Sequence, residues 1–305
     1  GPSRHELKFL FPTAAKGDFL QGLDFGLAPD SNAGDTGAYR VSSLYYDTPR
    51  LDAVYEKIDG ILRRKKFRLR YYGTPEPQPA AAFFEIKHRY GNKISKERVR
   101  LTPEMTQRLL AEQADLCELR QMADTSPVAG RILKFHAETP LQPVVIVSYL
   151  REAWVGSEDP SLRVTWDHEL TAHPPDDYLS PGSSSGVQFL PSDQVVLEVK
   201  FDELLPRWLQ QRLIHHGLRP IRYSKYLEAV LARFFGSVKV DSDRYARDIG
   251  NVTREVIDRL AGTGAELEIT IDIQATKPEG FDESEVRTIG ENARVLKFDP
   301  SSGFE

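Results

Sequence analysis

The chain has 305 residues, 40% hydrophobic and 28% charged, and its 40 Lys and Arg against 45 Asp and Glu give a net charge of −5. This is the composition of an ordinary globular protein, and no apolar run approaches the roughly 20 residues that a membrane-spanning helix needs. The single cysteine, Cys117, excludes an internal disulfide and any multi-Cys metal site. We therefore expect a cytoplasmic, reducing location.

Charge is unevenly distributed along the chain. Residues 238–305 carry 9 Lys and Arg against 15 Asp and Glu, whereas residues 62–100 carry 12 against 3. We predict a main domain at 4–237 and a small acidic module of unknown role at 238–305, after a scar of protease cleavage at 1–3. A local basic site in a nearly neutral domain indicates a focused anionic ligand and argues against a nucleic-acid surface.

Strand-forming segments dominate the first 200 residues. We predict strands, in chain order, at 4–11, 39–49, 61–73, 81–89, 93–101, 144–154, 162–170 and 195–201. Helices are predicted at 13–27, through 102–135, at 204–216 and at 224–235. Because the strands follow one another without a helix between each pair, the pattern favours an antiparallel α+β fold over a doubly wound sheet.

The C-terminal module has a pattern of its own. A helical stretch at 243–262 is followed by ELEITIDIQA at 266–275, in which apolar residues alternate strictly with polar ones. After a turn and a short helix, ARVLKF at 293–298 reads as another strand. The module is therefore predicted to be a small α/β unit, and no catalytic constellation is evident in it.

Three Glu-x-Lys tripeptides lie within predicted strands, at 6–8, 85–87 and 198–200. Residues i and i+2 of a strand share a face, so in each case Glu and Lys project together and the apolar neighbours point the other way. Four other strands align polar or charged side chains in the same manner: Arg68 with Arg70, Lys96 with Arg98 and Arg100, Tyr149 with Arg151, and Arg163 with Thr165 and Asp167.

For any one of these strands, the aligned charges can be explained by a solvent-exposed face of an ordinary two-layer sheet. Taken together, the aligned positions are richer in Arg and Lys than solvent faces normally are, and these residues bind phosphate oxygens well. The carboxylates would repel a phosphate chain, but Mg²⁺ or Mn²⁺ bridges carboxylate and phosphate oxygens. We therefore predict an antiparallel β-barrel tunnel with charges inside, helices packed outside and a bound Mn²⁺ or Mg²⁺.

An ordered set of motifs covering about residues 4–235 resembles the VTC family. These are the polyphosphate polymerase domains of the triphosphate-tunnel (CYTH-like) superfamily. The motifs are Glu-x-Lys, YRVSSLYYDTP, KFRLRYYG, FFEIKHRYGNKISKERV, YLREAW, LRVTWD, VVLEVKF and RYSKYLEAV. The resemblance implies a tunnel that binds ATP or another nucleoside triphosphate and extends an inorganic polyphosphate chain from a pyrophosphate or phosphate primer.

The resemblance also implies roles for individual residues. Phosphate groups would be bound by Lys8, Arg68, Arg70, Lys87, Lys96, Arg98, Arg151 and Arg163, and terminal phosphates by Ser224 and Lys225. Of these, Arg68, Arg70, Lys87 and Arg151 would be catalytic together with Glu198. Glu198 would hold the metal, with Glu6 and Glu85 as supporting acids of the tunnel.

Two other functions are compatible with the same residues. A tunnel hydrolase would cleave inorganic or nucleoside triphosphate with water in place of the acceptor phosphate. A non-catalytic sensor would bind polyphosphate or nucleotide and relay a signal through the acidic module, but the presence of Glu198 favours an enzyme. Family relatives often act beside membrane proteins, so the resemblance implies a membrane-protein partner. The local basic site, as stated above, predicts no nucleic-acid partner.

Overall fold

The computed structural model describes residues 4–23, 25–31, 37–73, 81–91, 93–110, 115–175, 186–233, 238–277, 279–299 and 302–303. The scar predicted at 1–3 lies outside these residues. The chain divides into two compact units, Gly1–Gly236 and Ser237–Glu305. Each unit is treated by itself.

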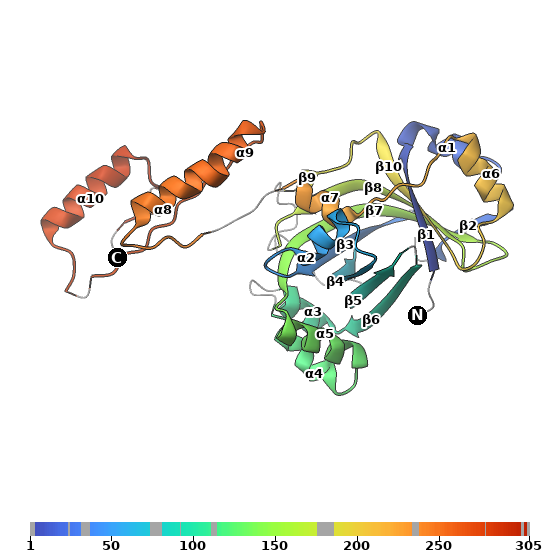
Figure 1. The fold of residues 1–305 in the computed structure, drawn as a ribbon, viewed down its shortest axis with the longest axis horizontal. Coiled ribbons are helices and arrows are strands. Elements are labelled where there is room, and N and C mark those ends of the chain that lie inside the picture. The colour runs from blue at the N-terminus through green and yellow to red at the C-terminus, as the bar shows by residue number, and fades with distance from the viewer. Residues whose placement is uncertain are drawn as a thin grey trace. The chain divides into compact units, whose positions relative to one another are not determined.

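An antiparallel sheet forms the first unit (Figure 1). The strands are β1 (Arg4–Pro12), β2 (Leu27–Pro29), β3 (Ala38–Asp47), β4 (Arg63–Tyr72), β5 (Ala81–Tyr90), β6 (Lys93–Leu101), β7 (Gln142–Gly156), β8 (Arg163–His173), β9 (Val187–Gln188) and β10 (Gln194–Phe201). Within the described residues the order is β2-β7-β3-β4-β5-β6-β1-β10-β8-β9, and β7 also pairs with β8. Eight of these strands therefore close into a barrel, which confirms the predicted fold.

The barrel has one narrow seam. Among the described residues, β1 pairs with β6 at two positions, Arg4↔Ile94 and His5↔Lys93, whereas it pairs with β10 from His5 to Pro12. β4, β5 and β6 form a regular meander, and the β5–β6 hairpin turns at Gly91, whose φ of 57° is left-handed. The predicted hairpin is therefore present.

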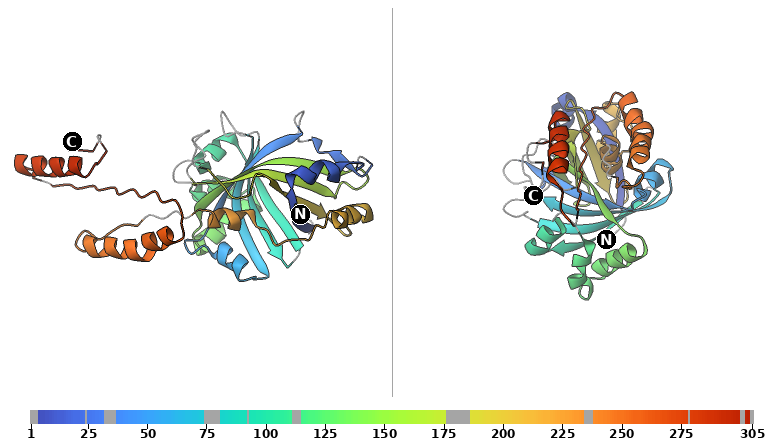
Figure 2. Two further views of the ribbon diagram at one scale, coloured as in Figure 1. Left: turned by 90° about the horizontal axis from the view of Figure 1, so that it is seen from above. Right: turned by 90° about the vertical axis from the view of Figure 1, so that its left-hand side faces the viewer.

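Helices cover the outside of the barrel on two sides (Figures 1 and 2). On one side lie α1 (Lys16–Leu20) and α6 (Arg207–His215), and on the other α3 (Pro103–Leu110), α4 (Arg120–Ala123) and α5 (Pro127–Glu138), with 3₁₀ turns at Thr13–Ala15 and Leu116–Leu119. In contrast, α2 (Asp52–Ile58) and α7 (Lys225–Leu231) contribute side chains to the interior. The helix predicted at 13–27 is shorter than expected. Gly22, with a φ of 72°, turns the chain so that β2 can join β7.

The strand alternation separates the two faces of the wall. Outward residues such as Leu69 and Phe84 pack with α3–α5 in one core, and outward residues such as Phe11 and Trp166 pack with α1 and α6 in another. A third apolar cluster lies on the inward face, where Val147 and Val196 meet Tyr226 of α7. The interior therefore has an apolar end beside α7 and a charged remainder.

The second unit corrects the α/β prediction for residues 238–305. Its elements are α8 (Tyr245–Val252), a π-helical turn (Thr253–Ile257), α9 (Asp258–Gly262) and α10 (Glu283–Val295), and its described residues include no strand. The alternating segment pairs with no other described segment, whereas a strand needs a hydrogen-bonded neighbour. The predicted strand at 293–298 begins inside α10, which runs to Val295 and starts at a capping box formed by Asp282 and Glu285.

Candidate functional site: a cationic tunnel

The charged inward faces of the barrel surround a cavity of about 100 Å³. Its lining comprises Glu6, Lys8, Tyr45, Lys57, Arg64, Lys66, Arg68, Arg70, Lys87, Arg89, Tyr149, Arg151, Glu198, Lys200, Tyr223, Ser224, Lys225 and Tyr226. Eleven of these residues are Lys or Arg and only two are carboxylates. Strands β1, β3, β4, β5, β7 and β10 supply most of them, and α2, α7 and the two residues before α7 supply the rest.

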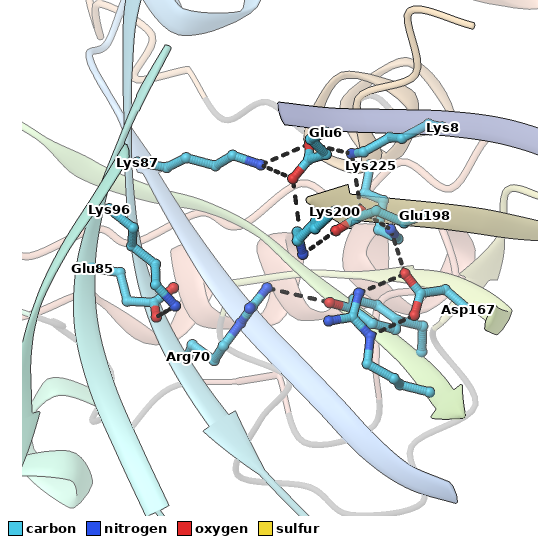
Figure 3. A network of polar contacts seen from close by, with 12 residues as sticks. Glu6, Lys8, Arg70, Glu85, Lys87, Lys96, Asp167, Glu198, Lys200 and Lys225 are labelled. Carbon is cyan, nitrogen blue, oxygen red and sulfur yellow. Dashed lines mark hydrogen bonds and ion pairs between the residues drawn. The ribbon is translucent and has the colours of Figure 1, made fainter. Parts of the chain in front are cut away.

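Glu6 and Glu198 lie side by side among lysines (Figure 3). Lys8 reaches both carboxylates, at 3.5 and 3.4 Å, and Lys200 forms ion pairs with both as well. Lys87 donates to the two oxygens of Glu6 at 3.1 and 3.2 Å. Burial and Glu198 raise the pKa of Glu6, but the three lysines outweigh them and lower it to about 2.

A second carboxylate cluster centres on Asp167 of β8, which is fully buried. Arg151 donates to its two oxygens at 2.7 and 2.8 Å, and Lys225 approaches to 2.6 Å (Figure 3). Burial raises the pKa of Asp167, but Arg151 and Lys225 lower it below its usual range, so the group is ionised. Lys225 also lies 3.7 Å from Glu198, which links the two clusters.

A third cluster is built on Glu85, also fully buried. Arg68 donates to one of its oxygens through two nitrogens at 2.8 and 2.6 Å, and Lys96 lies 3.0 Å from the other. Arg68 donates in addition to the Tyr45 hydroxyl at 3.2 Å. Burial opposes ionisation of Glu85, but Arg68 and Arg70 hold its pKa well below the usual range.

We call these three clusters the paired section of the tunnel. It contains the carboxylates Glu6, Glu85, Asp167 and Glu198 with the cations that contact them: Lys8, Arg68, Lys87, Lys96, Arg151, Lys200 and Lys225. Buried ions need such partners, because an isolated charge is strongly disfavoured away from water. The carboxylates therefore hold the cations in place before any ligand binds.

A different arrangement, which we call the unpaired section, is formed by Lys57, Arg64, Lys66 and Arg89. Their hydrogen bonds go to neutral oxygens: the carbonyls of Arg222, Ile61 and Gly91, and the Ser224 hydroxyl. None of the four makes an ion pair with a described carboxylate. Burial and neighbouring cations lower the pKa of Lys57, Arg64 and Lys66.

Arg70 also lacks a carboxylate partner among the described residues. It donates to the Ser43 hydroxyl and to the Tyr149 hydroxyl, both at 3.2 Å. Its guanidinium is therefore oriented by neutral groups, and its charge remains available to a ligand.

A larger hollow of about 670 Å³ shares Arg64 and Arg89 with the tunnel. It lies outside the wall, where outward residues of β4 and β5 meet α2 and α5. The two cavities therefore adjoin at these two arginines.

The carboxylates of the paired section fit a divalent ion only together with a phosphate ligand. Among the described residues, the one group of three or more possible ligands is Asp115, Cys117 and His136, outside the tunnel lining. Glu6 and Glu198 thus offer two carboxylates, which matches Mg²⁺ sites that use one or two carboxylates plus substrate phosphates and water. The pKa of Glu198 is held well below its usual range by Lys200, Lys8 and Lys225 against burial, so its oxygens are ionised.

The structure brings most of the predicted site residues into one place. Glu6, Lys8, Arg68, Arg70, Lys87, Arg151, Glu198, Ser224 and Lys225 line the cavity. Glu85 lies directly behind Arg68, and Lys96 reaches it from β6. Arg98 instead stacks 4.6 Å from the Phe83 ring, and Arg163 pairs with Asp30, so neither lines the cavity.

Several residues of the tunnel were assigned no role from the sequence. The alternation placed Asp167 on one strand face with Arg163, and Lys66, two positions before Arg68, could have been identified in the same way. Lys200 belongs to the third Glu-x-Lys tripeptide. In contrast, Lys57 and Tyr223 lie outside the strands, and no strand periodicity could have identified them.

The fold and the site define a class: a closed antiparallel β-barrel with a narrow, strongly cationic interior. The VTC domain family matches residues 3–234. The chain belongs to the VTC domain family. No curated protein sequence matches the chain.

Two solved structures are similar to the chain over most of their length. One is the PH1819 protein from Pyrococcus horikoshii OT3, 13% identical, with a TM-score of 0.36, covering 74% of this chain and 98% of that one. The other is an adenylate cyclase candidate (bh2851) from Bacillus halodurans, 12% identical, with a TM-score of 0.41, covering 73% and 96%. Within the described part of the chain, no helix combines the length and apolar character needed to cross a membrane.

Proposed function

We propose that this protein is a metal-dependent polyphosphate polymerase. It transfers the γ-phosphoryl group of ATP, or of another nucleoside triphosphate, to the end of an inorganic polyphosphate chain. The observation that supports this most is the tunnel lining, where eleven Lys and Arg accompany two carboxylates inside a closed barrel. A narrow cationic interior suits a thin, linear polyanion, and membership of the VTC domain family supports the same substrate class.

The reaction is a displacement at phosphorus. An oxygen of the terminal acceptor phosphate forms a bond to the γ-phosphorus, the bond from γ-phosphorus to the β–γ bridging oxygen breaks, and its electron pair leaves with the nucleoside diphosphate. The acceptor oxygen is already ionised, so no side chain has to remove a proton. Catalysis then depends on positioning and on neutralising charge.

The paired section is suited to that task because its cations are fixed in advance. Arg68 and Arg151 are each held by two hydrogen bonds of 2.6–2.8 Å to a buried carboxylate. A guanidinium that is already oriented loses little freedom when a phosphate oxygen arrives. Arg70, whose hydrogen bonds go to hydroxyl groups, makes no ion pair with a described carboxylate and can contact a phosphate oxygen.

Glu198, with Glu6 beside it, is the proposed Mn²⁺ or Mg²⁺ ligand. Held by these two carboxylates, the ion would supply positive charge that stabilises the phosphoryl group during transfer. Lys8, Lys200 and Lys225 keep Glu198 ionised in the meantime.

The test is a product analysis. The protein is incubated with ATP, Mn²⁺ or Mg²⁺ and a trace of pyrophosphate primer, and the products are run on a polyphosphate gel. We expect a ladder of long chains that disappears in Lys87→Ala and Glu198→Gln. Arg131→Gln, an exposed change on α5, is the matched control and should leave the ladder intact.

Other outcomes would replace the proposal. Release of orthophosphate without a ladder would indicate a triphosphatase that uses the same tunnel. Tight binding of added polyphosphate without turnover would indicate a sensor.

A further inference from the structure

The segment between α9 and α10 of the second unit has the residue pattern of a strand (Figure 1). Polar and apolar residues alternate without exception from Glu266 to Gln274. In an extended conformation one face would carry four aliphatic side chains: Leu267, Ile269, Ile271 and Ile273. Every residue at 261–276 is exposed. The described residues of the same chain therefore leave this apolar row uncovered.

The exposed apolar surface is unusual for a single chain. The exposed fractions of the four aliphatic side chains rise from 37% at Leu267 to 69% at Ile273. Single exposed apolar residues are common on protein surfaces, but a continuous row is typical of a surface that another chain covers. The helices of the unit contain no buried residue among those described. The unit therefore has no core of its own within its described residues.

The unit offers no second strand among its described residues. ARVLKF at 293–298 is the other segment with strand character, but it begins inside α10, which ends at Val295. None of the sheet pairings involves the described residues of this unit. A strand needs a hydrogen-bonded neighbour, and a two-stranded ribbon also needs cover on its apolar face. The neighbouring strand would then come from another chain.

A second copy of the segment supplies a matching apolar face. In an antiparallel ribbon with its two-fold axis at Ile271, the two copies of Ile271 face each other and Ile269 faces Ile273. An axis placed between two residues would instead set an apolar residue opposite a polar one on each face, because the side-chain period is two. An axis on a residue is therefore required.

The charges of the polar face select the position of that axis. With the axis at Ile271, Glu268 faces Gln274 and Thr270 faces Asp272, so no two carboxylates are directly opposed. Moving the axis to Thr270 sets Glu268 opposite Asp272. Moving it to Asp272 sets the two copies of Asp272 opposite each other. Like charges in direct opposition destabilise a ribbon, so the axis at Ile271 is favoured.

A helix of the same unit can cover the apolar face of such a ribbon. The helical stretch from Tyr245 to Gly262 comprises α8, the π-helical turn and α9. Four of its apolar residues follow one another at intervals of three or four, which places them in one stripe: Ile249, Val252, Val256 and Leu260. Two copies would supply one ribbon and two such stripes, which suffice for a two-layer core.

We propose that residues 266–276 pair with the same segment of a second copy of this chain, as an antiparallel ribbon with its two-fold axis at Ile271. The second unit is then a dimerisation module. The proposal does not rest on the proposed function, because the interface contains no residue of the tunnel. Residues 238–305 carry 9 Lys and Arg against 15 Asp and Glu, a net charge of −6 per copy, so added salt should strengthen the dimer.

The experiment is sedimentation equilibrium of the full chain without nucleotide, over a range of protein and NaCl concentrations. We expect a monomer–dimer equilibrium that Ile271→Lys weakens at least about 100-fold, because an apolar side chain is lost from both copies and two ammonium groups meet at the axis. Ile214→Lys is the matched control, since Ile214 of α6 is also 69% exposed, as Ile273 is, but lies in the first unit. It should change the dissociation constant less than about twofold.

Two further variants test the register. Gln274→Lys places an ammonium opposite Glu268 twice in each dimer and should tighten it about 2- to 10-fold. In a Cys117→Ser background, Ile271→Cys should form a covalent dimer under oxidation with copper phenanthroline, because directly opposed residues lie within reach of a disulfide. Leu267→Cys should not, because the two copies of this residue would lie about 26 Å apart along the ribbon.

Several results would overturn the proposal. A wild-type chain that stays monomeric up to about 100 µM has no such interface. A dimer that Ile271→Lys leaves intact, or that Ile214→Lys weakens equally, is formed through another surface. A dimer that salt or Gln274→Lys weakens, or that Leu267→Cys cross-links as readily as Ile271→Cys, contradicts the pairing at Ile271. All of these outcomes are independent of whether the tunnel makes polyphosphate.

Discussion

The two sections of the tunnel differ in the partners of their Lys and Arg side chains. In the paired section each cation contacts Glu6, Glu85, Asp167 or Glu198, at distances such as 2.7 Å from Arg151 to Asp167. In the unpaired section the cations contact only neutral oxygens, such as the Ser224 hydroxyl 2.7 Å from Lys66. Most cations of both sections lie on inward strand faces of one barrel, with Lys57 on α2 and Lys225 on α7, so strand position alone does not explain the difference.

The comparison shows how a protein can enclose many like charges. Internal carboxylates stabilise the folded protein without ligand, but they also offset part of the attraction for a polyanion. Cations without carboxylates attract the ligand fully, at a cost to the free protein. A mutation should therefore act mainly on stability in the paired section and mainly on ligand binding in the unpaired one.

The largest expected effect is that of Asp167→Ala in the paired section. Removing this carboxylate leaves Arg151 and Lys225 buried without their partner, which should lower the free energy of unfolding by about 3–5 kcal/mol. Urea denaturation monitored by circular dichroism would measure it. Asp193→Ala, at an exposed position, should stay within about 0.5 kcal/mol, and an equal loss in both variants would contradict the assignment.

Glu198→Gln should reduce turnover at least about 100-fold, because a metal ligand supports several kcal/mol of charge stabilisation. The metal dependence of the variant's rate tests the role of Glu198 more directly than the rate itself. Raising the Mn²⁺ concentration should no longer increase the rate of the variant as it does that of the wild type. Tripolyphosphate affinity in EDTA should not fall, because the change removes a negative charge from the lining. A fall in that affinity would mean that Glu198 mainly positions Lys8 and Lys200.

Two groups in the tunnel, Lys87 and Glu6, should each make stability rise with pH, in two separate pH ranges. Burial and Lys8 lower the pKa of Lys87 to about 7 in spite of Glu6. The unfolded chain then binds more protons than the folded one between pH 7 and about 10, so this group makes stability rise with pH there by up to about 1.4 kcal/mol per unit. The pKa of Glu6 is lowered to about 2. Glu6 therefore stabilises the folded protein at pH values above the usual pKa of a glutamate, and this contribution is lost as the pH falls towards 2.

Urea denaturation at pH 7, 8 and 9 would test the alkaline side, with Lys87→Met as the comparison. The variant should show a shallower rise of unfolding free energy with pH. An unchanged slope would show that Lys87 keeps an ordinary affinity for its proton.

Lys66→Met should stabilise the ligand-free protein, by about 1 kcal/mol, in contrast to Asp167→Ala. The change removes an ammonium that has no carboxylate partner and replaces it with an apolar chain of similar length. Thermal denaturation without phosphate would show the gain, and added tripolyphosphate should protect the variant less than the wild type. A clear loss of stability would mean that the Ser224 contact outweighs the repulsion.

Much of this comparison could be predicted from the sequence, and the limits have physical reasons. Period-two alternation identified the inward faces, and hence Glu198, Arg70 and most of the lining. It could not show which cations meet a carboxylate, because Arg68 contacts Glu85 across β4 and β5, and Lys225 reaches Asp167 from a helix. The alternation also failed at 266–275, because it reports amphipathic character and not the presence of a neighbouring strand.

The smallest expected effect concerns Arg163, which the family resemblance placed among the phosphate ligands. The structure pairs it with Asp30 and leaves it out of the cavity lining, with 35% of its side chain exposed. Arg163→Gln should therefore change tripolyphosphate affinity less than about twofold, whereas Arg70→Gln should weaken it about tenfold or more, since Arg70 lines the cavity and has no carboxylate partner. Titration calorimetry on the two variants compares the same chemical change at two places in one barrel. Equal losses would extend the phosphate path past Arg151 to the far end of β8, and the paired section would then be the middle of a longer binding site.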